Sequence, residues 1–339
     1  MTTTMTTGGP TRTRVRWRRV LLIALAIAVL AEVGVRALDS RLPPVTGWPG
    51  YEYALHEEQL AALGGDPDLL VIGDSSAAVA IRPDELVEDG VASSGYNYWL
   101  GGAPMRSLEL HASEVLLPRT TPRTVVVAVT MRNFNEAPSQ EGHLAALRAS
   151  SAFRRVTGRR SWLDHVDDRL QAGSAVFRHR EILRDPLGLV RALRSPGLPD
   201  RLASDGHIAD RGGDRLADEA AGHRRAEREA LADFAVSPRE VGALDDLLTE
   251  LRRRDTQVVV VSLPVAAAFV ELADGGRQDY LRFMSAVRAT GRANGVEVLD
   301  TMEQSWPDEL FGDVNHLNDK GAARLRPILA EAIQSLPEA

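Results

Sequence analysis

The chain has 339 residues, with 40 basic and 47 acidic side chains, which gives a formal net charge of −7. Hydrophobic residues make up 44%, a share typical of a folded soluble domain and too low for a protein with many membrane spans. The acidic balance argues against a nucleic-acid-binding protein. The cysteine-free composition excludes a disulfide framework, a cysteine-bound zinc ion and an iron–sulfur cluster.

The N-terminal 38 residues separate basic from apolar side chains. Residues 1–19 end in the basic run TRTRVRWRR, and residues 20–31 are uncharged and mostly apolar. A membrane-spanning helix needs about 20 residues. Residues 20–38 supply that length only if Glu32 and Arg36 lie near the outer interface.

This pattern predicts a basic cytoplasmic tail over 1–19 and an uncleaved transmembrane signal anchor over 20–38. The alternatives are a secretory signal cleaved near Ala26-Ile27-Ala28 and a buried core helix. Because flanking arginines stay in the cytoplasm, both membrane-targeting interpretations place the rest of the chain outside it. We therefore expect a single-pass protein of the cell membrane with an extracytoplasmic C-terminal domain.

The remaining chain alternates between strand and helix patterns. Residues 39–65 begin with a run rich in proline and glycine, and we assign them to a linker. Apolar runs predict buried strands at 68–72, 125–130, 257–263 and 296–299, and periodicity predicts helices at 105–117, 238–254, 277–293 and 319–335. Such strands indicate a mainly parallel sheet covered on both faces. Residues 141–235 interrupt the alternation, and we expect a mostly helical insertion or lid there, in part loosely ordered.

The first chemical signal is Gly73-Asp74-Ser75-Ser76, directly after the first predicted strand. A turn of this kind places a hydroxyl at the carboxyl edge of the sheet, where ligands bind in open α/β folds. The following helix offers backbone N–H groups to a developing oxyanion. Taken alone, the tetrapeptide also fits a serine that only caps a helix.

A second signal, near the C-terminus, is an aspartate three residues before a histidine, Asp313 and His316. The carboxylate can orient one ring nitrogen while the other faces a nucleophile. The alternative is a surface loop that leads into the last helix, with Asn318 or Asp319 as its cap. A metal site is less well supported because these two residues offer two ligands and no obvious third is nearby. We expect neither a metal nor a cofactor.

Possible oxyanion donors follow the next two elements. Gly102, in Gly101-Gly102, can supply a backbone N–H, and Asn133 or Asn135, just past the 125–130 strand, can supply a side-chain amide. Each of these residue types is also common in ordinary turns. All of these loops, together with Ser75 and His316, fall on the carboxyl side of the predicted sheet and can converge.

In this combination the sequence resembles the SGNH, or GDSL, hydrolase superfamily over most of residues 66–336, apart from 141–235. The resemblance implies a flavodoxin-like three-layer α/β/α domain over 66–339, with Ser75 as nucleophile, His316 as base and Asp313 as orienting acid. It also implies an oxyanion hole built from the backbone N–H groups of Ser75 and Gly102 and the side chain of Asn133.

One block departs from the superfamily pattern. The usual Gly-x-Asn-Asp is replaced by Thr130-Met131-Arg132-Asn133-Phe134-Asn135, which leaves the choice between the two asparagines open. The N-terminal membrane segment and the block Gly101-Gly102-Ala103-Pro104 are similar to anchored bacterial members, such as D-alanyl transfer proteins of lipoteichoic acid synthesis and alginate-acetylation proteins.

These features predict an extracytoplasmic serine esterase or O-acyltransferase that acts on acylated envelope glycans or lipids through an acyl-enzyme. Hydrolysis and transfer share that intermediate, so the sequence leaves both open. The alternative is a catalytically weak accessory protein that binds a polytopic membrane O-acyltransferase or an envelope polymer. The irregular third block and the anchor motivate this second hypothesis.

Overall fold

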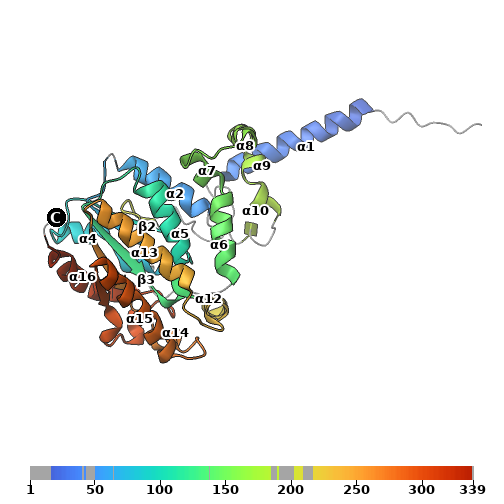
Figure 1. The fold of residues 1–339 in the computed structure, drawn as a ribbon. Helices are drawn as coiled ribbons and strands as arrows, with labels where there is room; N and C mark the ends of the chain where they lie inside the picture. The colour runs from blue at the N-terminus through green and yellow to red at the C-terminus, as the bar shows by residue number, and fades with distance from the viewer. Residues whose placement is uncertain are drawn as a thin grey trace, which may run out of the picture. The chain divides into compact units, whose positions relative to one another are not determined.

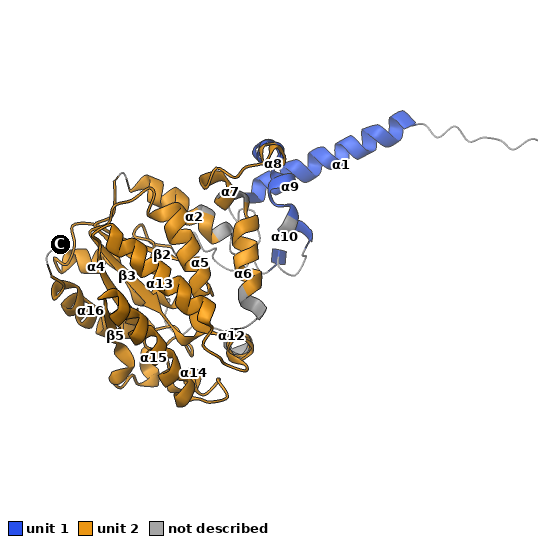
Figure 2. Ribbon diagram, viewed as in Figure 1, with its two compact units in different colours: residues 1–45, 166–195 blue, residues 46–165, 196–339 orange. Residues whose placement is uncertain are grey.

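The computed structural model describes residues 17–39, 42, 50–63, 65–136, 138–184, 189–190, 202–208 and 217–337. The chain divides into two compact units, residues 1–45 with 166–195 and residues 46–165 with 196–339 (Figure 2). Most of the expected cytoplasmic tail over 1–19, and residues 43–49 of the expected linker, lie outside the described residues.

The larger unit is built on a five-stranded parallel sheet with the order β2-β1-β3-β4-β5. Figure 1 labels β2 and β3 of this sheet, with helices around it. The strands are β1 (Leu69–Gly73), β2 (Gly95–Trp99), β3 (Thr124–Val129), β4 (Gln257–Ser262) and β5 (Glu297–Asp300). This is the flavodoxin-like strand order, in which ligands bind where the order reverses, between β1 and β3. The predicted fold class is therefore confirmed, and Ser75 follows a strand at the reversal point.

Both faces of the sheet are covered by helices because the strand residues are apolar on both sides. Leu70, Val127 and Val260 belong to one core, with helices α5 (Met105–His111), α13 (Pro238–Arg253) and α15 (Arg277–Asn294). Val71 and Val126 belong to the other core, with α3 (Ser75–Ala80), α4 (Pro83–Glu88) and α16 (Asp319–Gln334). A π-helical turn at Ala112–Leu116 extends α5, and α14 (Ala267–Val270) follows β4.

The edge strand β2 is absent from the sequence prediction because its sequence, GYNYW, carries glycine and asparagine. The fold uses the polar side chain: Asn97 donates its amide hydrogens to the carbonyls of Ala77 and Ile81, at 2.8 Å each. The backbone N–H of Asn97 donates to the carbonyl of Asp205 at 2.7 Å, and the Trp99 indole donates to Gly206. The segment 202–208 therefore covers part of the outer edge of the sheet.

The region assigned to a linker contains a packed helix, α2 (Gly50–Ala62). Tyr53 and His56 of α2 are fully buried, and Glu52 accepts the backbone N–H of Gly101 at 2.8 Å. The described part of the insertion is mainly helical, with α6 (Pro138–Ala149), α7 (Ser151–Val156), α8 (Trp162–Gly173), α9 (Ala175–Arg178), α10 (Arg180–Arg184) and α12 (Ala217–Leu231).

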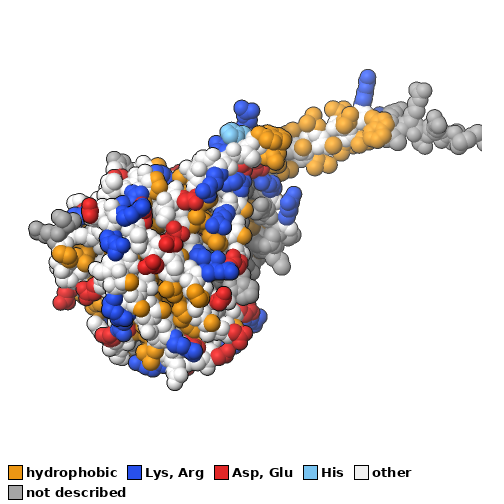
Figure 3. Space-filling view, in the orientation of Figure 1, with side chains coloured by type: hydrophobic (Ala, Val, Ile, Leu, Met, Phe, Trp, Pro, Cys, Tyr) orange, Lys and Arg blue, Asp and Glu red, His pale blue; other side chains and the backbone are white. Residues whose placement is uncertain are grey.

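The smaller unit contains α1 (Trp17–Leu38), the one helix among the described residues that is long and apolar enough to cross a membrane. Only 6% of the most apolar 18-residue stretch of α1 is buried. Figure 3 shows hydrophobic side chains along the surface of this helix. This exposure excludes the buried core helix. Among the described residues, the C-terminal end of α1 is packed, where Val35 forms a small core with Leu42 and Ala175.

Candidate active site

Ser75 is the first residue of α3, and a single residue, Asp74, separates it from the end of β1. Asp74 caps the helix by accepting the backbone N–H of Ser76 at 2.9 Å. Gly73 permits the tight turn, because a Cβ at this position would lie 2.5 Å from the Cβ of Ala77 and 3.0 Å from the carbonyl oxygen of Ala128. The Gly-Asp-Ser sequence thus places the Ser75 hydroxyl directly at the carboxyl edge of the sheet.

Asp313 and His316 lie in a tight loop before α16. The loop is closed by a backbone bond from Gly312 to His316 and by pairing of Phe311 with Leu317. Asp313 Oδ1 also accepts the backbone N–H of His316, at 2.9 Å. Asn318 then caps α16, as one of the two predicted caps. These bonds fix the carboxylate and the imidazole relative to each other.

The structure brings the three predicted catalytic side chains together. Nε2 of His316 lies 2.9 Å from Oγ of Ser75, although the two residues are 241 positions apart. Nδ1 of His316 lies 2.9 Å from each carboxylate oxygen of Asp313. His316 is 7% exposed, so the chain of contacts is largely shielded from water. In this arrangement the imidazole can take a proton from the serine while the carboxylate holds the other ring nitrogen.

The surroundings of Asn133 differ from those expected of a free oxyanion donor. Its amide nitrogen donates to Oδ2 of Asp74 and to the carbonyl of Ala103, at 2.8 Å each. Its side-chain oxygen accepts the backbone N–H of Thr130 at 2.6 Å. A direct contribution of Asn133 to an oxyanion therefore requires one of the two donated bonds to open.

The hydrogen bonds of Asn133 also connect two loops of the candidate site. Asp74 precedes Ser75, and Ala103 follows Gly102, so one buried amide links the two turns that carry the predicted backbone donors. Gly102 has a φ of +61°, a backbone conformation that favours glycine.

Asn135 has a different role in the fold. Its amide nitrogen donates to the carbonyl of Ala230 at 2.7 Å, and its side-chain oxygen accepts the backbone N–H of Ala235 at 2.9 Å. The side chain therefore fastens the end of the insertion to the loop after β3. Of the two asparagines, only Asn133 contacts the turn that carries Ser75.

Helix α12 brings to the site residues that the sequence analysis did not select. Nε2 of His223 lies 2.7 Å from Oδ1 of Asn315 and 3.6 Å from Oδ2 of Asp313. Glu227, one turn later, is buried and pairs with Arg132 at 3.3 Å. Burial raises the pKa of the Glu227 carboxyl, while the Arg132 charge acts in the opposite direction. No local pattern marks His223, because its helix is rich in alanine and arginine.

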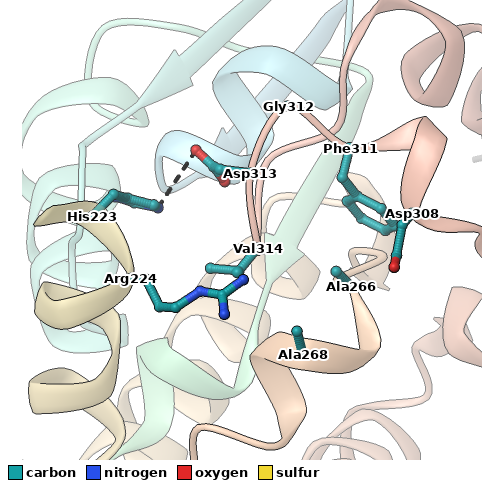
Figure 4. A pocket seen from close by; sticks show the side chains of 9 residues that line it. All are labelled: His223, Arg224, Ala266, Ala268, Asp308, Phe311, Gly312, Asp313 and Val314. Carbon is teal, nitrogen blue, oxygen red and sulfur yellow. Dashed lines mark ion pairs between the residues drawn. The ribbon is translucent and has the colours of Figure 1, made fainter. Parts of the chain in front are cut away.

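A cavity of about 500 Å³ adjoins the carboxylate of Asp313 (Figure 4). His223 and Arg224 border it from α12, and Asp308 and Phe311 border it from the loop before Asp313. The remaining lining is Ala266, Ala268, Gly312, Asp313 and Val314. The walls therefore combine small apolar surface with charged groups, which suits a ligand that has both polar and apolar parts.

His223 also changes the sequence argument about metals. The ligand atoms of His223, Asp313 and His316 all lie within 4.8 Å of one another, so a third potential ligand is present. In the described structure, however, both ring nitrogens of His316 already contact Ser75 and Asp313. A metal ion bound to either nitrogen would break the Ser75–His316–Asp313 contacts.

A family model described as DltD protein matches residues 216–326. This confirms the predicted similarity to SGNH-like D-alanyl transfer proteins. The match covers about a third of the chain and includes Asp313 and His316, while Ser75 lies outside it. No curated protein matches the chain.

Solved structures with similar folds include esterases and a lipase. A GDSL-like lipase from Bacteroides thetaiotaomicron is 10% identical with a TM-score of 0.42, covering 83% of this chain and 97% of its own. Axe2, an acetylxylan esterase from Geobacillus stearothermophilus, is 13% identical with a TM-score of 0.37, covering 79% and 95%. An aryl esterase of M. smegmatis is 15% identical with a TM-score of 0.35, covering 79% and 99%.

Proposed function

We propose that the chain is a membrane-anchored serine acyl-transfer enzyme, an esterase or O-acyltransferase that acts on acylated glycans or lipids of the cell envelope. One observation carries the proposal: Nε2 of His316 lies within hydrogen-bond distance of Oγ of Ser75, while Nδ1 faces Asp313. A nucleophile, a base and a group that orients the base are the elements that covalent acyl transfer needs.

In the proposed reaction, His316 takes the hydroxyl proton as Oγ of Ser75 attacks the ester carbonyl. Asp313 keeps the other ring nitrogen protonated and stabilises the imidazolium that forms. The tetrahedral oxyanion then faces the backbone N–H groups of Ser75 and Gly102. As the first residue of α3, Ser75 has no acceptor for its N–H within the helix. Each such donor typically contributes about 10²–10³ in rate.

Collapse of the tetrahedral intermediate breaks the ester bond, and His316 returns the proton to the leaving alcohol. A second hydroxyl then attacks the acyl-enzyme, with His316 again as base. If the acceptor is water the result is hydrolysis, and if it is a sugar or lipid hydroxyl the result is transfer. The cavity beside Asp313 is the proposed location for part of the substrate or acceptor.

We also propose that α1 anchors the chain in the membrane, with the catalytic unit outside the cytoplasm. Its 22 residues extend about 33 Å, enough to cross the hydrocarbon core. Arg18 and Arg19 mark the cytoplasmic end by the positive-inside rule. This location is the reason for proposing envelope glycans or lipids as substrates, as the similarity to D-alanyl transfer proteins also suggests.

The test uses the full chain in detergent with a fluorophosphonate probe and p-nitrophenyl acetate. Ser75→Ala should abolish labelling and ester hydrolysis. Ser76→Ala is the matched control, since its buried hydroxyl has no hydrogen-bond partner among the described residues, and it should react like wild type. Labelling that survives Ser75→Ala would remove Ser75 as the nucleophile.

The accessory-protein hypothesis gives a different result in cells. If the chain only assists a membrane O-acyltransferase, Ser75→Ala should support envelope acylation as well as wild type does, and the wild-type chain should not label. If the chain carries the acyl group, acylation should fall to the level of a deletion strain.

A further inference from the structure

Helix α8 carries apolar side chains that face solvent instead of the core. Trp162 is 72% exposed, Leu163 59%, Val166 41% and Leu170 46%. With about 100° of rotation per residue, all four lie within an arc of about 100°. The polar residues of α8 fall outside that arc: Asp164, His165, Asp167, Asp168, Arg169 and Gln171. We call the four exposed side chains the α8 stripe.

The C-terminal end of α8 is fastened to the outer end of α1. The Arg36 guanidinium donates to the carbonyl of Gly173, the last residue of α8, at 2.9 Å. The Glu32 carboxylate accepts the hydroxyl of Ser174 at 2.8 Å and the backbone N–H of Ala175 at 2.7 Å. Helix α9 packs against α1 beside these bonds. Residues 173–175 therefore lie beside Glu32 and Arg36, at the same level along the axis of α1.

The depth of this level in a membrane is set by the length of the uncharged part of α1. Residues 20–31 extend only about 18 Å along the helix axis, less than the ~30 Å thickness of the hydrocarbon core. If α1 spans the bilayer, the Glu32–Arg36 turn must lie at the outer edge of the hydrocarbon. The hydrogen bonds from Ser174 and Ala175 satisfy the Glu32 carboxylate there, which removes much of the free-energy cost of its position.

We infer that α8 is an interfacial helix that inserts the α8 stripe into the outer leaflet beside the membrane span. The inference rests on the proposed anchoring by α1. Helix α8 is about 18 Å long and ends at the boundary of the hydrocarbon, so its exposed apolar face lies beside lipid. Tryptophan at one end, an apolar arc and charged residues on either side form the pattern of helices that lie in the plane of a membrane.

The cysteine-free chain permits a direct test. The full chain, reconstituted in vesicles of equal parts phosphatidylcholine and phosphatidylglycerol, would carry one cysteine labelled with the fluorophore NBD. Leu163→Cys reports on the α8 stripe. Ala172→Cys is the matched control, because it is exposed and nine residues on, which places it on the opposite side of α8. Leu25→Cys reports on the middle of α1.

If α8 lies in the interface, nitroxide-labelled lipids should quench NBD at position 163 several-fold more than at 172, and aqueous iodide should show the reverse. Equal quenching of both positions by iodide would overturn the inference, since α8 would then face water. Shielding of position 163 from both quenchers would also overturn it, because a protein would then cover the stripe. Weak lipid quenching at position 25 would instead refute the anchoring by α1.

Discussion

The proposed role of Asp313 gives a prediction whose size follows from the geometry. In Asp313→Asn, the amide oxygen can take the place of Oδ1, which accepts backbone N–H groups and lies 2.9 Å from Nδ1 of His316. The amide nitrogen then stands in place of Oδ2, which also lies 2.9 Å from Nδ1, so the substitution removes the negative charge and no longer favours the ring with its proton on Nδ1. Two unit charges about 4 Å apart interact by about 4 kcal/mol at an effective dielectric constant of ~20. Losing that interaction in the transition state should slow acylation by about 10³-fold.

The rate of fluorophosphonate labelling of Ser75 by the full chain measures this effect, with p-nitrophenyl acetate hydrolysis as a second readout. Asp308→Asn is the control, since it removes a carboxylate from the same cavity without a contact to His316. Labelling within a few-fold of wild type in Asp313→Asn would refute the reasoning. An equal loss in Asp308→Asn would attribute the effect to the general field of the cavity.

Three further predictions concern the support of the site and the stability of the fold. Asn133→Ala removes the buried hydrogen bonds that link the turns beside Ser75 and Gly102. The free energy of unfolding, measured in urea, should fall by about 2–3 kcal/mol. Labelling of Ser75 should also fall under conditions in which the variant is folded. Full labelling would show that Asn133 does not hold these turns. In His223→Ala, Asn315 loses its hydrogen bond to His223, beside the loop that carries Asp313 and His316. Labelling of Ser75 should slow by up to about tenfold, and His223→Gln should restore the rate because glutamine can still donate to Asn315. No rescue would indicate that the ring itself is needed. Burial lowers the pKa of His56 to about 3, so His56 stays neutral in the folded chain. In the unfolded chain it binds a proton below about pH 6.5. Through His56, the free energy of unfolding should therefore fall by up to about 1.4 kcal/mol per pH unit as the pH drops from 6.5 toward 3. Because burial also lowers the pKa of His111 and His143, His56→Gln should reduce this slope between pH 7 and 5 without abolishing it, and an unchanged slope would refute the contribution of His56.

The sequence indicated the fold because the central strands are apolar on both faces. Runs such as Leu69–Gly73 and Thr124–Val129 leave little alternative to a parallel sheet between helices. Strand β2 was not predicted because Asn97 is explained by a tertiary contact. Its side-chain amide donates to the carbonyls of Ala77 and Ile81 at the end of α3, and no sequence pattern within β2 indicates these partners. Helix α2 was hidden by the proline and glycine residues before it.

The candidate site, like the fold, could be predicted in part from the sequence. Ser75, Asp313 and His316 are recognisable because each lies next to a turn with a distinctive local sequence. The environment of Asn133 was not predictable, because its partners Asp74 and Ala103 belong to two other loops. His223 was also hidden, since its importance comes from where the insertion returns to the main domain.

The contact between segment 202–208 and β2 affects more than the packing of one strand. Unpaired outer strands offer backbone groups to which another chain can add, and proteins suppress this by obstructing the edge. Here the N–H of Asn97 is occupied by Asp205, and the Trp99 ring is held by Gly206. Segment 202–208 therefore leaves less of the β2 edge open to pairing with a strand of a second chain.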